Sequence, residues 1–150
     1  MVASDTEYVF EYPWEMVIEA FYLKYKFPNP SLPDMIDVQY TDLKFDPDSQ
    51  TASLTRRSRV KIAAPAFILK LAGVESLDFE TKIEICRPSK IMKAETRNVQ
   101  FSSVLRMHEL ITLRPDDATP ERTQYRTQAS FGIAYIMGIS VRLSLCINYL

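Results

Sequence analysis

The N-terminal part of the chain changes from a two-residue to a helical period of apolar positions. Thr6 to Glu11 places Tyr8 and Phe10 on one face, which is typical of a strand. Pro13 suits the first helical residue, because its missing N–H needs no partner there. The apolar residues that follow at helical spacing are Trp14, Val17, Ile18, Phe21, Tyr22 and Tyr25. The pattern predicts a short strand and then an amphipathic helix.

Prolines end this helix and introduce a hairpin. Pro28-Asn29-Pro30 and Pro33-Asp34 hold an extended turn, since proline cannot continue a helix. Met35 to Phe45 then alternates with one slip of phase, which indicates a strand with a β-bulge. Asp46 to Ser49 has the composition of a turn, so we expect a second arm from Thr51 to Ile62.

The rest of the chain predicts a meander of strands, preceded by one apolar segment. Ala63 to Ala72 is apolar and is followed by Gly73, as in a short helix or a lid-like loop. The later strands are expected at 75–87, 90–100, 102–114 and 123–135, separated by turns at Pro88-Ser89 and Pro115 to Pro120. A curved antiparallel sheet with one N-terminal helix, an α+β fold, follows from this order.

The predicted sheet needs a cover on its apolar face, and one helix covers only part of it. Phe131 to Leu150 has a single charged residue, Arg142. The length would suit a membrane span, but an arginine near the middle costs about 2.5–3.5 kcal/mol on insertion. We therefore favour the end of a strand and the start of a packed C-terminal helix.

Composition narrows the class of protein. The chain has 150 residues, 47% of them hydrophobic and 25% charged, as expected for one globular domain over 1–150. The net charge of −1 argues against binding of nucleic acid, so any attraction for phosphate must be local. No secretory signal is recognisable after Met1, and the chain reads as soluble and intracellular.

Residues for catalysis or metal binding are sparse. Cys86 and Cys146 are far apart and form no Cys/His cluster, so we expect no metal site. Three glycines cannot make a glycine-rich phosphate loop. His108 has no nucleophile motif nearby and suits a half-buried strand residue better than a base. We predict no cofactor and no enzymatic activity.

Several segments resemble the PRELI (slowmo-like) family. Tyr8 to Phe21 looks like the opening strand and helix of that family, and Lys26-Phe27-Pro28-Asn29-Pro30 resembles its basic–aromatic–Pro-Asn-Pro signature. Glu95 to Val99 is similar to the Thr-x-Asn strand of the family, and Met107-His108-Glu109 to the next strand, which usually carries a glutamate. The resemblance extends from about Tyr8 to Ser140 in the same order of elements.

The resemblance implies a seven-stranded antiparallel sheet curved around helices and enclosing a lipid-sized cavity. It also implies the mitochondrial intermembrane space, a small twin-Cys-x9-Cys helical partner, and transfer of phosphatidic acid or a related phospholipid between membranes. The family ends in a long C-terminal helix, which is shortened here, since the sequence given stops at Leu150. The alternative that this shortening suggests is a non-transferring module that docks a helical partner.

The same resemblance implies head-group residues. Counting back from Pro28 selects Lys26 as the basic residue of the signature, whereas counting forward from Ala20-Phe21 selects Lys24. Arg59 and Lys61 resemble a second basic cluster beside the lid. Each of these four cations has the alternative of a solvent-facing charge. The lid residues Phe67, Ile68 and Leu71 share one side and suit either membrane contact or core packing.

Overall fold

The computed structural model describes residues 2–62, 73–102 and 105–133 and places them in seven strands and one helix. Their bounds are β1 (Val2–Phe10), α1 (Trp14–Lys24), β2 (Met35–Asp46), β3 (Thr51–Lys61), β4 (Ser76–Cys86), β5 (Ile91–Asn98), β6 (Leu105–Pro115) and β7 (Thr123–Ile133). The α+β fold with a seven-stranded antiparallel sheet and an N-terminal helix is confirmed.

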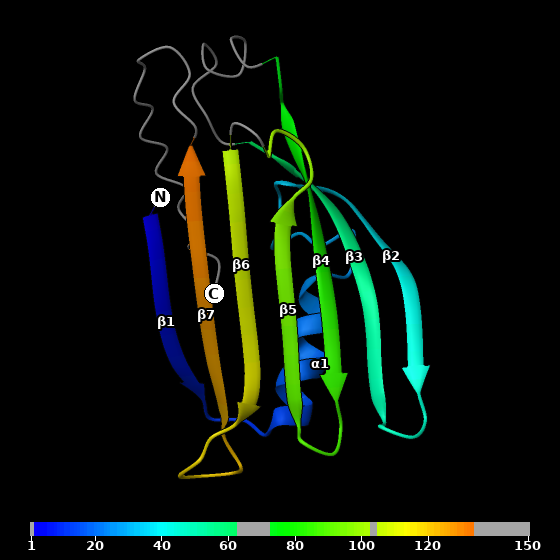
Figure 1. Ribbon diagram of the computed structural model, residues 1–150, viewed down its shortest axis with the longest axis vertical. Helices are drawn as coiled ribbons and strands as arrows, with labels where there is room; N and C mark the ends of the chain where they lie inside the picture. Colours follow the sequence, from blue (N-terminus) through cyan, green and yellow to red (C-terminus); the bar gives the residue numbers. More distant parts are fainter. Residues whose placement is uncertain (1, 63–72, 103–104, 134–150) are drawn as a thin grey trace.

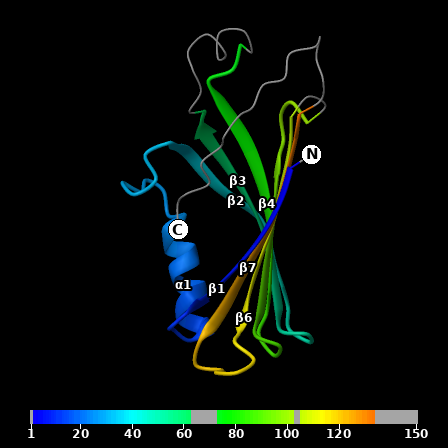
Figure 2. The same ribbon diagram turned by 90° about the vertical axis from the view of Figure 1, so that its left-hand side faces the viewer.

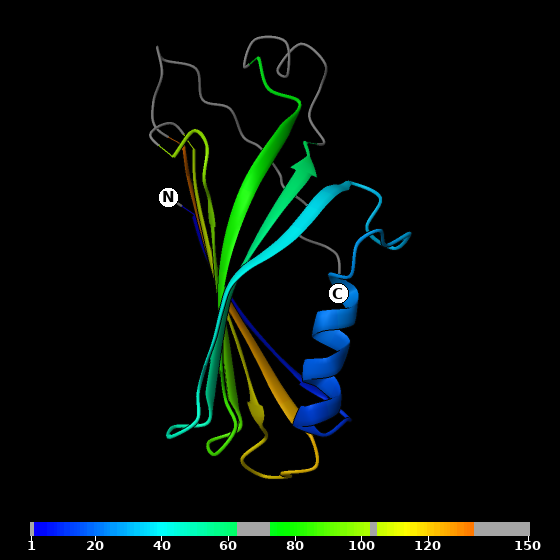
Figure 3. The same cartoon turned by 90° about the vertical axis from the view of Figure 1, so that its right-hand side faces the viewer.

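The sheet is an antiparallel meander from β2 to β7, with β1 added beside β7. The strand order is β1-β7-β6-β5-β4-β3-β2 (Figure 1). The first two strands therefore lie at opposite edges of the sheet, and the chain between them must cross one face. It does so with α1, which lies on one side of the twisted sheet (Figure 2, Figure 3). We call the face that α1 covers the inner face.

The hydrophobic core lies between α1 and the inner face. Alternate residues of a strand point to the same face, and strands β3 to β7 contribute buried side chains from that face to the core. Trp14 also donates a hydrogen bond from its indole Nε1 to the carbonyl oxygen of Leu113, at 3.1 Å. The buried core residues are Trp14, Val17, Ile18, Leu54, Ile83, Met92, Ala94, Ile111, Leu113 and Tyr125.

The start of β1 and a bulge in β2 can be compared with the strands that the sequence pattern predicts. β1 begins at Val2 rather than at Thr6, because the residues before Thr6 also pair with β7, as in Asp5 with Gln128. The predicted bulge in β2 is confirmed: the register with β3 shifts between Thr41 and Lys44.

Two predicted elements lie outside the described residues. They are the apolar segment with Phe67, Ile68 and Leu71, and the tail that follows β7. The extent of the domain over 1–150 stays a prediction. Within the described ranges, no helix combines the length and the apolar character that crossing a membrane requires.

Candidate functional site

A cavity of about 360 Å³ lies between α1 and the inner face of strands β1, β6 and β7. Its walls are almost entirely apolar and aromatic, which is typical of a pocket for an apolar ligand. Among the described residues that line it, Lys24 is the only charged one. The lining residues are Phe10, Tyr12, Met16, Val17, Ala20, Phe21, Lys24, Tyr25, Ile111, Leu113 and Tyr125.

Lys24 closes the last turn of α1 and is half-buried. Its Nζ lies 5.6 Å from the centroid of the Tyr25 ring. Burial lowers the pKa of Lys24, the nearby charge of Arg56 lowers it further, and the charge of Glu109 raises it. A lysine in this position offers a cation where water is scarce, so an anionic group would bind it more strongly than on the surface.

The Pro-Asn-Pro segment holds the end of this helix in place. The Asn29 side-chain amide donates a hydrogen bond to the carbonyl oxygen of Lys24, at 2.6 Å. Its Oδ1 accepts one from the backbone N–H of Ser31, at 2.9 Å. The carbonyl groups of a last helical turn have no partner inside the helix. Asn29 thus supplies that partner and fixes the turn that presents Lys24.

Arg56 is a second cation, buried beneath α1 and only 4% exposed. Its guanidinium carbon lies 3.4 Å from the centroid of the Tyr25 ring, and Nη2 donates to Thr81 Oγ1 at 3.2 Å. Burial raises the pKa of Tyr25, while the charge of Arg56 lowers it. Nε and Nη1 are buried and have no hydrogen-bond partner in the described part of the chain. Leaving a buried polar group unsatisfied costs about 1–3 kcal/mol, so these N–H groups favour an anion.

Arg56 begins a polar row that crosses the inner face from strand to strand. Arg56 of β3 pairs with Thr81 of β4, Thr81 with Thr96 of β5, and Thr96 with Glu109 of β6. The hydroxyls of Thr81 and Thr96 are 2.9 Å apart and hydrogen-bonded. Thr127 of β7 donates its hydroxyl to Glu109 Oε1 at 3.2 Å. A band of donors and acceptors therefore runs across the apolar inner face of the sheet.

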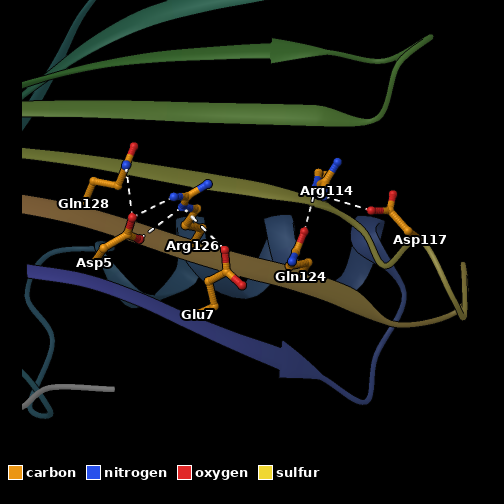
Figure 4. A network of polar contacts seen from close by, with 7 residues as sticks. All are labelled: Asp5, Glu7, Arg114, Asp117, Gln124, Arg126 and Gln128. Carbon is orange, nitrogen blue, oxygen red and sulfur yellow. Dashed lines mark hydrogen bonds and ion pairs between the residues drawn. The ribbon is translucent and has the colours of Figure 1, made fainter.

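The opposite face of the sheet has the reverse character, because several of its cations are paired with carboxylates. Figure 4 shows Arg126 between Asp5, at 2.6 Å, and Glu7, at 3.5 Å, on neighbouring strands. His108 belongs to the same face and lies 2.8 Å from Glu95. This face is a ladder of solvent-facing charges.

Comparison with known proteins identifies the family. The sequence model of the PRELI-like family matches residues 15–147 of the chain. The chain belongs to the PRELI-like family. A slowmo homologue from Dictyostelium discoideum is 23% identical over 133 residues, covering 85% of this PRELI-like chain and 58% of the relative. A CRAL-TRIO domain-containing protein of Caenorhabditis elegans is 24% identical over 87% of the chain and 18% of its own length. The chain thus spans less than two thirds of the length of each of these relatives.

Solved structures support the fold alone. The Zhui aromatase/cyclase from Streptomyces sp. R1128 aligns with a TM-score of 0.55 and 14% identity, over 90% of this PRELI-like chain and 70% of that one. At this level of identity the likeness concerns the fold and carries no statement about function.

The structure separates the four cations expected at the head group. Lys24 lines the cavity, whereas Lys26 is exposed beyond the end of α1. Arg59 and Lys61 are exposed on the face opposite the cavity. Arg59 is bound through two hydrogen bonds to Asp78, at 2.7 and 3.2 Å. The structure does not bring these three residues to the cavity.

Two residues of the inner face were not selected from the sequence. Arg56 shares the parity of Leu54 and Val60, so a charged residue at an apolar position was the signal that could have found it. Glu109 is likewise a charged residue at a position of the same parity as the apolar residues Met107 and Ile111. Within the described ranges, no group of three or more His, Cys, Asp or Glu residues could hold a metal ion.

Proposed function

We propose that this PRELI-like chain binds one phospholipid at the inner face of its sheet and carries it between mitochondrial membranes. The observation that carries the proposal is Arg56, a buried guanidinium next to an apolar cavity, whose Nε and Nη1 have no hydrogen-bond partner among the described residues. Membership of the PRELI-like family supports a lipid ligand.

A phospholipid carrier needs an apolar region for the acyl chains and cations for the phosphate, and the site has an apolar cavity beside Lys24 and Arg56. Each CH₂ group removed from water contributes about 0.8 kcal/mol, so acyl chains favour the aromatic and aliphatic walls around α1. A phosphate oxygen accepts charge-assisted hydrogen bonds from Arg56 and Lys24, and these are about twice as strong as neutral ones. Phosphatidic acid is the simplest phospholipid that meets both requirements. Binding and release need no covalent step, so we propose a carrier and not an enzyme.

The location and the partner are part of the proposal. We place the protein in the mitochondrial intermembrane space, with a small twin-Cys-x9-Cys helical protein as its partner, on the strength of its family. Exposed apolar side chains near the β2–β3 hairpin, such as Leu43 and Phe45, offer a surface for a partner or a membrane.

The test is transfer of fluorescent phosphatidic acid between donor and acceptor vesicles, with and without the helical partner. Diacylglycerol with the same acyl chains serves as the lipid without a phosphate. We expect transfer of phosphatidic acid, a several-fold loss in Lys24→Gln, and no loss in Lys26→Gln, which changes the same charge two positions away.

Other results would change the assignment. Equal effects of the two lysine variants would remove Lys24 from the site. A folded protein that binds the partner, but neither transfers lipid nor carries any by mass spectrometry, would be a docking module instead.

A further inference from the structure

The described part of the loop between β5 and β6, residues 99–102, exposes two large apolar side chains. Val99 is 53% exposed and Phe101 is 45% exposed. The backbone of Phe101 has a φ of 59°, in the left-handed region that residues other than Gly, Asn and Asp rarely adopt. Such a conformation persists only where the surrounding structure holds it. The β5–β6 loop is therefore held in a shape that leaves an aromatic side chain in contact with solvent.

Buried Asn98 fastens the base of this loop. Its Nδ2 donates hydrogen bonds to the carbonyl oxygens of Gln100, at 2.6 Å, and of Leu105, at 2.8 Å. Its Oδ1 accepts one from the backbone N–H of Met107, also at 2.8 Å. The backbone N–H of Leu105 donates in turn to the carbonyl oxygen of Phe101, at 2.7 Å. A loop that is already ordered loses little conformational freedom when its exposed side chains bind.

Two cations lie at the same end of the sheet as the loop. Lys61 is the last residue of β3, and Arg106 is near the start of β6 (Figure 1). The backbone N–H of Val99 donates to the carbonyl oxygen of Asp78 on β4, which is the strand beside β3. Arg106 Nε donates to the carbonyl oxygen of Ser102 at 3.2 Å. Both cations are exposed, and neither forms an ion pair within residues 2–62, 73–102 and 105–133.

The opposite end of the sheet also exposes apolar side chains, but its charge is different. Leu43 and Phe45 are exposed near the turn between β2 and β3, at the lower end of the sheet in Figure 1. The charged residues of the segment that contains them are Asp42, Lys44, Asp46 and Asp48. Three carboxylates against one ammonium group repel an anionic surface. The charge of the two ends therefore directs an anionic surface to the β5–β6 loop.

We propose that the β5–β6 loop docks the protein on an anionic membrane surface. Val99 and Phe101 enter the head-group region, and Arg106 and Lys61 bind lipid phosphates. Aromatic side chains favour the membrane interface, and basic residues near it are attracted by anionic lipids. The inference rests on the proposed function, because a carrier must touch the membranes that it serves, and it adds the surface for that contact.

The size of the exposed surface favours a membrane over a protein partner. A stable protein interface buries about 800 Å² on each partner, which is far more than two apolar side chains supply. A carrier must also leave the membrane again, so a shallow contact suits it. Burial of two side chains, assisted by two cations, gives a binding that salt weakens and that stays reversible.

The experiment measures flotation of the full chain with vesicles of phosphatidylcholine, either alone or mixed with phosphatidylglycerol. We expect binding to the anionic vesicles, and we expect high salt to weaken it. Asparagine accepts the left-handed backbone, so Phe101→Asn should unfold at a temperature no lower than wild type. Its vesicle affinity should fall about tenfold, through the loss of one buried aromatic side chain. Arg106→Gln should lower the affinity about fivefold, and only at low salt.

Phe45→Asn makes the matched change at the other end of the sheet and should leave the vesicle affinity unchanged. A loss in Phe45→Asn without a loss in Phe101→Asn overturns the inference and assigns the contact to the β2–β3 hairpin. Equal wild-type binding to the two kinds of vesicle, or none, overturns it as well. Val99→Ser tests the same loop at a residue with ordinary backbone geometry, and it should lower the affinity several-fold even if Phe101→Asn fails to fold.

Uptake of phosphatidic acid by the same proteins separates this inference from the proposed function. A wild-type protein that takes up lipid, but loses no vesicle affinity in Phe101→Asn and Val99→Ser, remains a carrier and refutes only the docking loop. A wild-type protein that docks through Phe101 but takes up no lipid refutes the carrier function and supports the docking loop.

Discussion

Arg56 and Arg59 lie three positions apart on β3 and have opposite surroundings. Arg59 is exposed and bound to Asp78 through two hydrogen bonds. Arg56 is buried against Tyr25 and donates a hydrogen bond to Thr81, while its Nε and Nη1 have no hydrogen-bond partner among the described residues. An odd separation along a strand reverses the face, and the face decides what a cation can do.

The difference is also one of energy. An exposed ion pair contributes little, because water already solvates both charges well. A buried guanidinium with unsatisfied N–H groups makes the folded state less stable than an apolar side chain of similar size would. Under the proposed function, the head group supplies the missing acceptors, so the empty protein bears a cost that the ligand offsets.

The largest expected difference between the faces concerns packing. Leu113 is 1% exposed beneath α1, so Leu113→Ala should lower the free energy of unfolding by about 2–5 kcal/mol through the cavity that it leaves. Leu110, on the same strand but the opposite face, is the matched control, and Leu110→Ala should cost less than about 1 kcal/mol. Urea unfolding of both variants measures the difference. Equal losses would contradict the assignment of the core to one face.

The second prediction is that replacing Arg56 has opposite effects on stability and on lipid uptake. In Arg56→Leu, the unsatisfied N–H groups disappear, so the free energy of unfolding of lipid-free protein should hold or rise by up to about 3 kcal/mol. Lipid uptake should fall at least tenfold, because the phosphate loses its main donor. Thermal unfolding and vesicle uptake are the two measurements.

Arg59→Leu is the control for this prediction. It removes the same charge from the opposite face, together with its contact to Asp78. Uptake should not change. If Arg59→Leu reduced uptake as much as Arg56→Leu, the head group could not be assigned to the inner face.

A smaller effect should follow from loosening the helix end. Asn29→Asp keeps the oxygen that accepts from Ser31 but loses the amide that donates to the Lys24 carbonyl. We expect the free energy of unfolding to fall by about 1 kcal/mol, the usual contribution of one hydrogen bond, and uptake to fall less than in Lys24→Gln. Asn29→Ala should cost slightly more, since it loses both contacts. No difference between Asn29→Asp and wild type would show that Asn29 does not position Lys24.

The fold could be predicted from the sequence because its elements follow local periodicity. The apolar stripe from Trp14 to Tyr25 predicts α1, and the turn at Asp46 to Ser49 predicts the hairpin of β2 and β3. The early start of β1 could not be predicted, since it depends on pairing with β7, more than a hundred positions away. Such pairing leaves no local signal.

The site was harder to predict for a related reason. The resemblance to the family indicates Arg59 and Lys61 as a second basic cluster, but basic residues occur on both faces of this strand. Only the parity of Arg56 with Leu54 separates the buried cation from the exposed ones. The choice between Lys24 and Lys26 depended on where α1 ends, and the Asn29 contact to Lys24 marks that point only in three dimensions.

The smallest expected effect belongs to the ladder on the opposite face. Hydrogen bonding to Arg126 is the main cause that lowers the pKa of Asp5, and the Arg126 pKa is correspondingly raised. A carboxyl whose pKa is lowered on folding stabilises the protein above its ordinary pKa of 3.8, and this contribution is lost as pH falls through the lowered value. Arg126→Gln should therefore be slightly less stable than wild type at neutral pH, and the gap in urea midpoints should close below pH 3.8 and in high salt. Lipid uptake should stay at the wild-type level, because Arg126 faces away from the cavity. A loss of uptake would show that the two faces are coupled, and it would break the separation on which the proposed site depends.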